Sequence, residues 1–173
     1  MQAGYQFQVI PPSESAESGT SGRESAAELV SRLALQKAAD VASRVDRGIV
    51  IGCDTVADCD GQILGKPGDV CDARRMLNSL RGREHRVFSG LCVWRRPNDV
   101  SRTAVAETLL RMDPISDEAV EEYLRSRQWE GKAGAFGYQD RLGWIHIIRG
   151  SESNVVGLPL ELLAEMLNAL SDG

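Results

Sequence analysis

The sequence predicts an α/β or α+β protein in which helices pack against a mixed β-sheet. One observation is a set of strand-like segments that alternate apolar and polar residues or run apolar, at 5–10, 49–53, 85–94, 103–112 and 143–148. Another is a set of segments with helical spacing of apolar residues and capping signals, lying between those strands. The chain has 173 residues, 42% of them hydrophobic and 26% charged, which fits one domain with an ordinary core.

The first elements are a strand, a polar loop and a long helix. Residues 5–10 alternate aromatic or aliphatic side chains with Gln, and residues 11–22 are rich in Pro, Ser and Gly. Ser21 and Glu24 have the spacing of a capping box, so we expect the helix to begin there and Gly48 to end it. The apolar side of this helix carries Val30, Leu33, Val41 and Val45.

A buried strand, a hairpin and a short helix come next. Strand 49–53 is followed by the dipeptide Asp-Gly at 60–61, a hairpin turn signal that returns the chain through residues 62–64. Asp69 is placed to cap a helix that stops at Gly82. Its inward positions are Ala73, Met76, Leu77 and Leu80.

The second half of the chain continues with strands and helices. Segments 85–94 and 103–112 read as two strands joined by the turn "RPND". Ser116 caps a helix whose first turn carries two acidic residues, a favourable arrangement at a helix N-terminus. Strand 143–148 precedes a final helix that begins near Pro159. That helix buries Leu160, Leu163, Leu167 and Leu170.

The composition narrows the class of protein. No apolar run approaches the roughly 20 residues that cross a bilayer, and the N-terminal residues lack the features of a signal peptide, so we expect a cytoplasmic protein. The net charge of −5 argues against broad binding to nucleic acid or membrane surfaces. The chain has no Cys-x-x-Cys pair, and we interpret His85 and His146 as hydrogen-bonded strand residues, so we do not expect a closed zinc site. We interpret the cysteines as reduced core residues: Cys53, Cys59, Cys71 and Cys92.

Asp54 is the first candidate for a catalytic or metal-binding residue. It directly follows a strand built for burial, where low-dielectric surroundings suit a general base or a metal ligand. The alternative is a turn-forming Asp bonded to nearby backbone amides. The residues alone leave both interpretations open.

Three lysines and a glycine-rich segment point toward an anionic ligand. Lys66 stands between Gly and Pro, and Lys37 lies among the apolar positions of the first helix. Segment 131–139, "GKAGAFGYQ", combines three glycines with Lys132, and glycine lets the backbone approach a ligand closely. Gln139 offers a donor and an acceptor, which suits the reading of a base edge. Taken together, these residues favour metal-assisted handling of a polyphosphate.

Six blocks of this sequence form a pattern: "RLALQKA" (32–38), "VIGCDTV" (50–56), "GQILGKP" (61–67), "LRGREHRVFSG" (80–90), "GKAGAFGYQ" (131–139) and "GSESNVVGLPL" (150–160). In this order they resemble the Maf-like nucleoside triphosphate pyrophosphatases. The resemblance implies an α/β fold with an elongated sheet and two lobes around a central cleft, often in a homodimer. It also implies hydrolysis of nucleoside triphosphates to the monophosphate and pyrophosphate with a divalent cation, Mg²⁺ or Mn²⁺.

The resemblance also implies a role for individual residues. Asp54 matches the proton acceptor for the attacking water and a metal ligand. Thr55 and Gln139 match positions that set base preference, and this pair is similar to the branch acting on dTTP and UTP. Glu14 or Glu17 matches an acidic residue in the first long loop, and we take Glu17 as a second metal ligand. The cations of the cleft are matched by Lys37, Lys66 and Lys132.

One departure from the family pattern concerns the start of the chain. The family begins with a strand and a Ser-x-Ser-Pro-Arg-Arg loop, whereas this chain begins within the helix that follows, so we expect residues 1–173 to form a single Maf-like domain truncated at its N-terminus. We favour a start assigned too late over a truncated relative, because the other motifs are intact. Two alternative functions are a non-catalytic nucleotide-binding regulator linked to cell division and another phosphate-ester hydrolase of the same fold.

Overall fold

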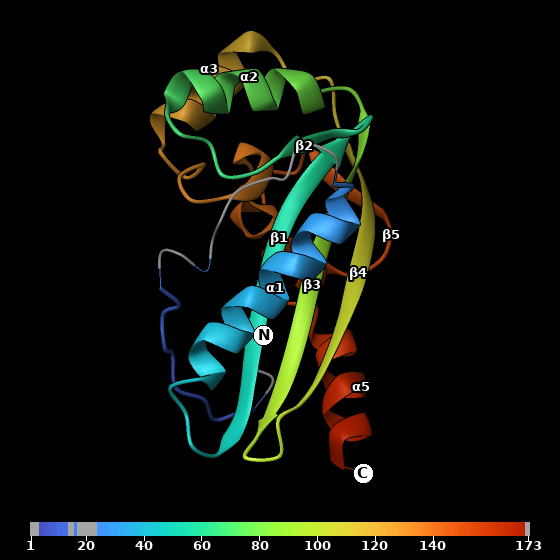
Figure 1. The fold of residues 1–173 in the computed structure, drawn as a ribbon. Helices are drawn as coiled ribbons and strands as arrows, with labels where there is room; N and C mark the ends of the chain where they lie inside the picture. The colour runs from blue at the N-terminus through green and yellow to red at the C-terminus, as the bar shows by residue number, and fades with distance from the viewer. Residues whose placement is uncertain (1–3, 14–15, 17–23, 172–173) are drawn as a thin grey trace.

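The protein is an elongated sheet flanked by helices (Figure 1). This computed structural model describes residues 4–13, 16 and 24–171. The described part contains, in chain order, α1 (Ala26–Ala42), β1 (Gly48–Cys59), β2 (Gln62–Leu64), α2 (Val70–Leu80), β3 (Glu84–Arg96), β4 (Val100–Met112), α3 (Asp117–Arg125), two short 3₁₀ turns (Ala133–Ala135 and Tyr138–Asp140), β5 (Ile145–Arg149), α4 (Glu152–Val156) and α5 (Leu160–Ser171).

The five strands form one sheet in the order β2-β1-β3-β4-β5. Each pair of neighbouring strands is antiparallel, and a single parallel bridge joins Arg81 to Met112. The α/β class with an elongated sheet flanked by helices is therefore confirmed, but the paired strands are antiparallel rather than the expected mixture of parallel and antiparallel. No helix in the described part of the chain is both long and apolar enough to cross a membrane.

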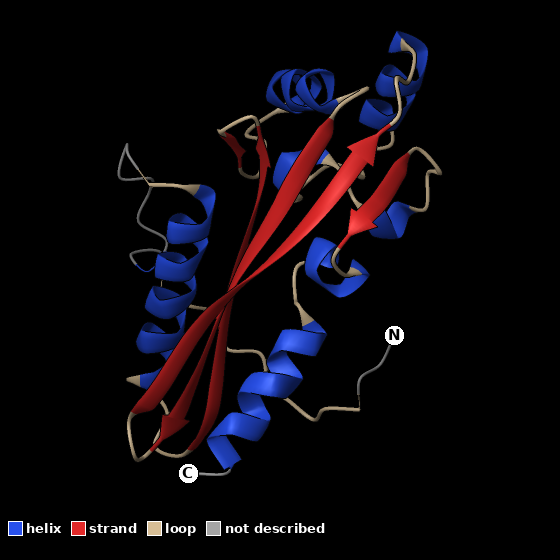
Figure 2. Ribbon diagram, turned by 90° about the vertical axis from the view of Figure 1, so that its right-hand side faces the viewer, coloured by secondary structure: helices blue, strands red, loops and turns tan. Residues whose placement is uncertain are grey.

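The helices divide between the two faces of the sheet (Figure 2). On β1, Gly52 packs against α1, whereas the next residue, Cys53, packs in the cluster beneath α5. Consecutive side chains of a strand point to opposite faces, so this alternation divides the molecule. Helix α1 covers one face, and α4 and α5 lie on the other.

Helix α1 lies unusually close to the sheet. A Cβ atom added to Gly52 would come within 2.4 Å of the Ala34 carbonyl oxygen, and one added to Gly90 within 2.0 Å of the Val30 carbonyl oxygen. No real Cβ atom tolerates such distances. These two glycines therefore set the distance between α1 and the strands β1 and β3.

The capping and turn signals of the sequence are confirmed. Asp60 and Gly61 have φ angles of 51° and 82°, the left-handed conformation that a tight hairpin between β1 and β2 needs. The Asp69 side chain accepts a hydrogen bond from the backbone N–H of Asp72 at the start of α2, and Ser116 caps α3 in the same way. The inward residues of α2 are those predicted: Ala73, Met76, Leu77 and Leu80.

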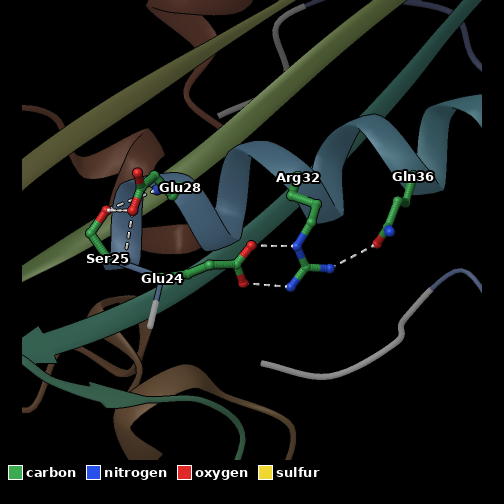
Figure 3. Close-up of polar contacts among 5 residues, drawn as sticks. All are labelled: Glu24, Ser25, Glu28, Arg32 and Gln36. Atoms are coloured by element: carbon green, nitrogen blue, oxygen red, sulfur yellow. Dashed lines mark hydrogen bonds and ion pairs between the residues drawn. The ribbon is translucent and has the colours of Figure 1, made fainter. Parts of the chain in front are cut away.

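The predicted start of the first helix is wrong by one turn. Ser25 is the N-cap of α1: its hydroxyl accepts a hydrogen bond from the Glu28 N–H at 3.3 Å, and the Glu28 carboxylate accepts one from the Ser25 N–H at 2.9 Å (Figure 3). Glu24 instead pairs with Arg32 through two contacts of 2.7 Å. Ser21 lies outside the described residues. The spacing Ser-x-x-Glu occurs twice here, so the sequence pattern could not distinguish the two starts.

Other boundaries also differ from the prediction. Residues 5–10 form no strand, and Tyr5, Phe7 and Val9 are exposed. Helix α1 ends at Ala42, and Gly48 begins β1 rather than ending the helix. The short helix α4 was not predicted. All four cysteines are free, as expected, but Cys71 is exposed rather than part of the core.

Candidate functional site

A pocket of about 300 Å³ opens beside the middle of β1. Helix α1, the loop after β2, the glycine-rich segment 131–139 and the end of α4 contribute to its walls. The lining residues are Lys37, Cys53, Asp54, Thr55, Lys66, Val87, Gly131, Lys132, Ala133, Phe136, Gln139, Val155, Val156 and Gly157.

The pocket lies at an edge of the sheet. Strand β2 pairs with β1 only at residues 57–59, so the preceding part of β1 has one edge without a strand partner among the described residues. Asp54 and Thr55 are neighbours on β1 and point to opposite faces of the sheet. Both line the pocket because it wraps around this edge. The site therefore has two halves, one on each side of β1.

The half on the α1 side carries an acid and its cation. Lys37 Nζ, from the middle of α1, lies 2.6 Å from Asp54 Oδ1. Each side chain is only 16% exposed. A charge-assisted hydrogen bond in such partial burial holds the carboxylate in a defined direction. The prediction that Asp54 follows the end of a strand is wrong, since β1 continues to Cys59 and Asp54 lies within it.

A second lysine is held by a carboxylate behind it. Lys132 Nζ lies 2.6 Å from both carboxylate oxygens of Asp140, whose side chain is 9% exposed. The Tyr123 hydroxyl donates a hydrogen bond of 2.8 Å to the same carboxylate, and burial followed by this bond raises the pKa of Tyr123. The phenol is thus a protonated donor that helps to fix Asp140, and through it Lys132.

Lys66 differs from these two lysines. It is exposed, and no ion pair to it is found within the part of the chain that the structure describes. Its loop is anchored next to it, because the Gly134 N–H donates a hydrogen bond of 3.0 Å to the Gly65 carbonyl. This bond brings the loop after β2 against the glycine-rich segment. Lys66 therefore supplies a positive charge that can meet an anionic ligand.

The half on the opposite face of β1 carries a thiol and a hydroxyl from the strand. The glycine-rich segment packs on this face too, since a Cβ added to Gly134 would lie 3.0 Å from the Ala57 Cβ. The Cys53 thiol donates a hydrogen bond of 3.2 Å to the Gly157 carbonyl, and the Thr55 hydroxyl lies 2.7 Å from the Ser89 hydroxyl. Burial raises the pKa of Cys53 to about 11, so the thiol is protonated near neutral pH. Val155 and Val156 add apolar surface to this half.

Six of the predicted site residues thus meet in one pocket: Lys37, Asp54, Thr55, Lys66, Lys132 and Gln139. Gln139 is exposed at the rim. Glu14 and Glu17 lie outside the described residues. Sequence reasoning did not assign roles to Cys53, Phe136, Gly157 and the two valines, although the blocks "GKAGAFGYQ" and "GSESNVVGLPL" contain most of them. Small and apolar wall residues give no chemical signal in a sequence, because they are indistinguishable from residues that only pack in the core.

The donor set of the pocket limits how a metal could bind. No group of three or more His, Cys, Asp or Glu side chains comes together in the described part of the chain. Asp54 is the one carboxylate among the described lining residues. Mg²⁺ is commonly held by one or two carboxylates together with substrate phosphates rather than by a cage of side chains. The pocket therefore fits a cation that arrives with a polyphosphate.

Comparison with known proteins identifies the family of this chain. The sequence profile of the family described as Maf-like protein matches residues 1–170. The chain belongs to this family. A Maf-like relative from Rhodopirellula baltica, a dTTP/UTP pyrophosphatase, is 52% identical over 166 residues, which is 95% of this chain and 73% of the relative.

More distant relatives carry the same description. The dTTP/UTP pyrophosphatase of Dictyoglomus turgidum is 40% identical over 168 residues, covering 96% of this chain and 86% of the relative. That of Thermococcus gammatolerans is 41% identical over 158 residues, or 91% and 82% of the two chains. The similarity to these relatives, including the one from Thermococcus, thus extends over nearly the whole of this chain.

Proposed function

We propose that this protein is a nucleoside triphosphate pyrophosphatase that hydrolyses dTTP and UTP, or modified pyrimidine nucleotides, to the monophosphate and pyrophosphate. The observation that carries the proposal is the meeting of three lysines and one carboxylate among the described lining residues of a single pocket, which suits a triphosphate. The Thr55 hydroxyl, the Gln139 amide and the two valines offer uncharged groups for a base. The choice of substrate is supported by the relatives from Rhodopirellula baltica and Dictyoglomus turgidum, which are dTTP/UTP pyrophosphatases.

Asp54 is the proposed general base. Its carboxylate accepts a proton from the water that attacks the α-phosphorus, and the bond between the α- and β-phosphates breaks. Lys37 holds Asp54 in the direction needed for this step, through the 2.6 Å contact. Lys66 and Lys132 bind oxygens of the pyrophosphate that leaves and stabilise its developing charge.

A divalent cation is part of the proposal. Mg²⁺ or Mn²⁺, held by Asp54 and phosphate oxygens, would neutralise phosphate charge when bound. Glu17 remains the predicted second ligand. Thr55 and Gln139 are proposed to read the base. A single domain over residues 1–173, a homodimer and a cytoplasmic location all stay predictions.

The direct test is a product analysis with a panel of nucleotides. Purified protein is incubated with Mg²⁺ or Mn²⁺ and with dTTP, UTP, CTP or 7-methyl-GTP, and pyrophosphate and orthophosphate are measured separately. We expect pyrophosphate and the monophosphate in equal amounts, with dTTP and UTP as the best substrates. Orthophosphate as the main product would indicate a phosphatase. Tight nucleotide binding without turnover would favour the regulatory alternative.

A further inference from the structure

A network of hydrogen bonds links the hydroxyls of Thr55, which is half-buried, and Ser89 in the pocket wall on the α4 side of β1. Thr55 Oγ1 is 2.7 Å from Ser89 Oγ and 3.5 Å from the Gly157 carbonyl oxygen. Ser89 Oγ is in turn 3.3 Å from the Asn154 carbonyl oxygen. Ser89 is completely buried. Of the two hydroxyls, only that of Thr55 belongs to a described lining residue of the pocket, and Gly157 lines the pocket beside it.

The carbonyl groups of Asn154 and Gly157, which face these hydroxyls, are held in place by hydrogen bonds. The Asn154 side chain, 1% exposed, donates hydrogen bonds to the Val87 carbonyl at 3.2 Å and to Thr108 Oγ1 at 2.9 Å. These bonds fasten α4 to β3 and β4. The Gly157 N–H also donates to the Asn154 carbonyl, at 3.0 Å. Both carbonyl acceptors near the two hydroxyls are therefore fixed by the backbone and a buried amide.

This arrangement determines where the Thr55 proton points. A carbonyl oxygen accepts hydrogen bonds and cannot donate, and each hydroxyl has one proton. In one arrangement, Thr55 donates to Ser89 at 2.7 Å and Ser89 donates to the Asn154 carbonyl at 3.3 Å. In the other, Ser89 donates to Thr55, whose own proton has only the Gly157 carbonyl at 3.5 Å, the limit of a hydrogen bond. The first arrangement has the shorter contacts, so the Thr55 proton points into the wall and the lone pairs of the Thr55 oxygen remain for a ligand.

We propose that Ser89 is a positioning residue that makes Thr55 a hydrogen-bond acceptor toward the pocket, so that the site selects a base presenting a ring N–H. This inference rests on the proposed function. Uracil and thymine carry an N–H between two carbonyls, whereas cytosine has a bare nitrogen acceptor at the same ring position. The Thr55 oxygen and the bare ring nitrogen of cytosine would repel each other, because both are acceptors. Thr55 could relieve this repulsion only by turning its proton toward the base, which would break its hydrogen bond within the protein.

The test is a double-mutant cycle on base discrimination. The measured quantity is the ratio of kcat/KM for UTP to that for CTP, in the parent and in Thr55→Val, Ser89→Ala and the double variant. We expect Thr55→Val to lower the ratio about tenfold, because the acceptor is lost. Ser89→Ala should lower the ratio about fivefold by raising the CTP value, since the Thr55 proton can then turn toward the base. In the double variant the Ser89 change should have no further effect, because it acts only through Thr55.

Two further measurements separate an effect on base discrimination from an effect on turnover or on folding. Dissociation constants for UMP and CMP test the same ratio without turnover, and Ser89→Cys replaces Ser89→Ala if the alanine variant does not fold. Additive effects of the two substitutions, or a ratio that neither changes, would overturn the inference while leaving the pyrophosphatase activity in place. A parent protein that prefers CTP and CMP would also overturn it. A parent that neither hydrolyses nor binds any nucleotide would instead refute the proposed function, and the inference with it.

Discussion

Lys37 Nζ and Asp54 Oδ1, 2.6 Å apart, join the middle of α1 to the middle of β1. This contact unites the only carboxylate among the described lining residues with a cation from the opposite wall. Two elements that are separated by a turn in the sequence thus meet at the point where the proposed chemistry begins.

The first prediction concerns Asp54. Asp54→Asn should lower kcat on dTTP or UTP by about 100-fold or more, as expected when a general base is lost. The fold should persist, because Asn has nearly the same shape and can still accept the Lys37 hydrogen bond. Steady-state kinetics measure the first effect and thermal unfolding the second. Asp58→Asn is the matched control, since Asp58 lies on the same strand outside the pocket and accepts a turn hydrogen bond from Gly61. Comparable losses in both variants would remove Asp54 from the mechanism.

The second prediction concerns the ion pair behind the pocket. Asp140→Asn should lower the free energy of unfolding by about 2 kcal/mol, because it removes a charged acceptor from a partly buried lysine and from the Tyr123 hydroxyl. Urea denaturation measures this change. Glu130→Gln is the control: its partner Arg127 is 76% exposed, and exposed pairs contribute roughly 0–1 kcal/mol. If both substitutions cost the same, Asp140 has no special structural role.

The third prediction concerns His85, which is 2% exposed and packs edge-on against Phe136. Neither ring nitrogen has a hydrogen-bond partner of normal geometry among the described residues, so the sequence-based expectation of a hydrogen-bonded histidine is wrong here, whereas His146 meets Asp113 at 2.9 Å. Burial lowers the pKa of His85 from 6.5 to about 4.

The sign of the pH effect follows from that shift. Between pH 6.5 and 4 the unfolded chain binds the proton while the folded protein does not, so the free energy of unfolding falls as the pH decreases. The loss should reach about 3 kcal/mol by pH 4 and then level off. His85→Leu should remove this contribution, which denaturation curves of variant and parent between pH 8 and 4 would reveal. Parallel pH dependences would show that His85 titrates normally.

The fourth prediction concerns the close approach of α1. Gly90→Ala should destabilise the protein by about 3 kcal/mol or more, because the added methyl group would meet the Val30 carbonyl at 2.0 Å and α1 would have to move. Gly68→Ala is the control, since no atom lies within 4 Å of the position of its Cβ. Chemical denaturation compares the two. A Gly90→Ala variant as stable as the control would show that α1 can shift freely.

Local signals predicted much of this fold. The Asp-Gly turn, the Asp69 and Ser116 caps and the alternation of the long strands each depend on residues adjacent in the sequence, so they are visible without tertiary information. Residues 5–10 show the same alternation and form no strand, because a strand also needs a neighbour to pair with.

The sequence predicted the charged residues of the candidate site but not the residues that form and support its walls. Asp54 and the three lysines stand out in the sequence because a charged side chain beside an apolar segment is costly to bury unless it has a partner or a function. Ser89 and Asn154 give no such signal, since their importance depends on contacts with residues 34 and 46 positions away in the sequence. The 3.6-residue period of a helix and the two-residue period of a strand show which face is buried, but not which residues that face contacts.

The position of the pocket at the edge of β1 also restricts what the chain can tolerate. Deleting one residue in β1 before Asp54 would turn the carboxylate toward α4 and place Thr55 opposite Lys37. The hydrophobic alternation could be repaired by compensating substitutions, but the exchange of acid and hydroxyl could not. Point substitutions on the α4 side, by contrast, leave the acid and lysines untouched. Strand β1 is therefore restricted in length and, on its α1 side, by Gly52 and Asp54, whereas substitutions on its α4 side could change the base preference.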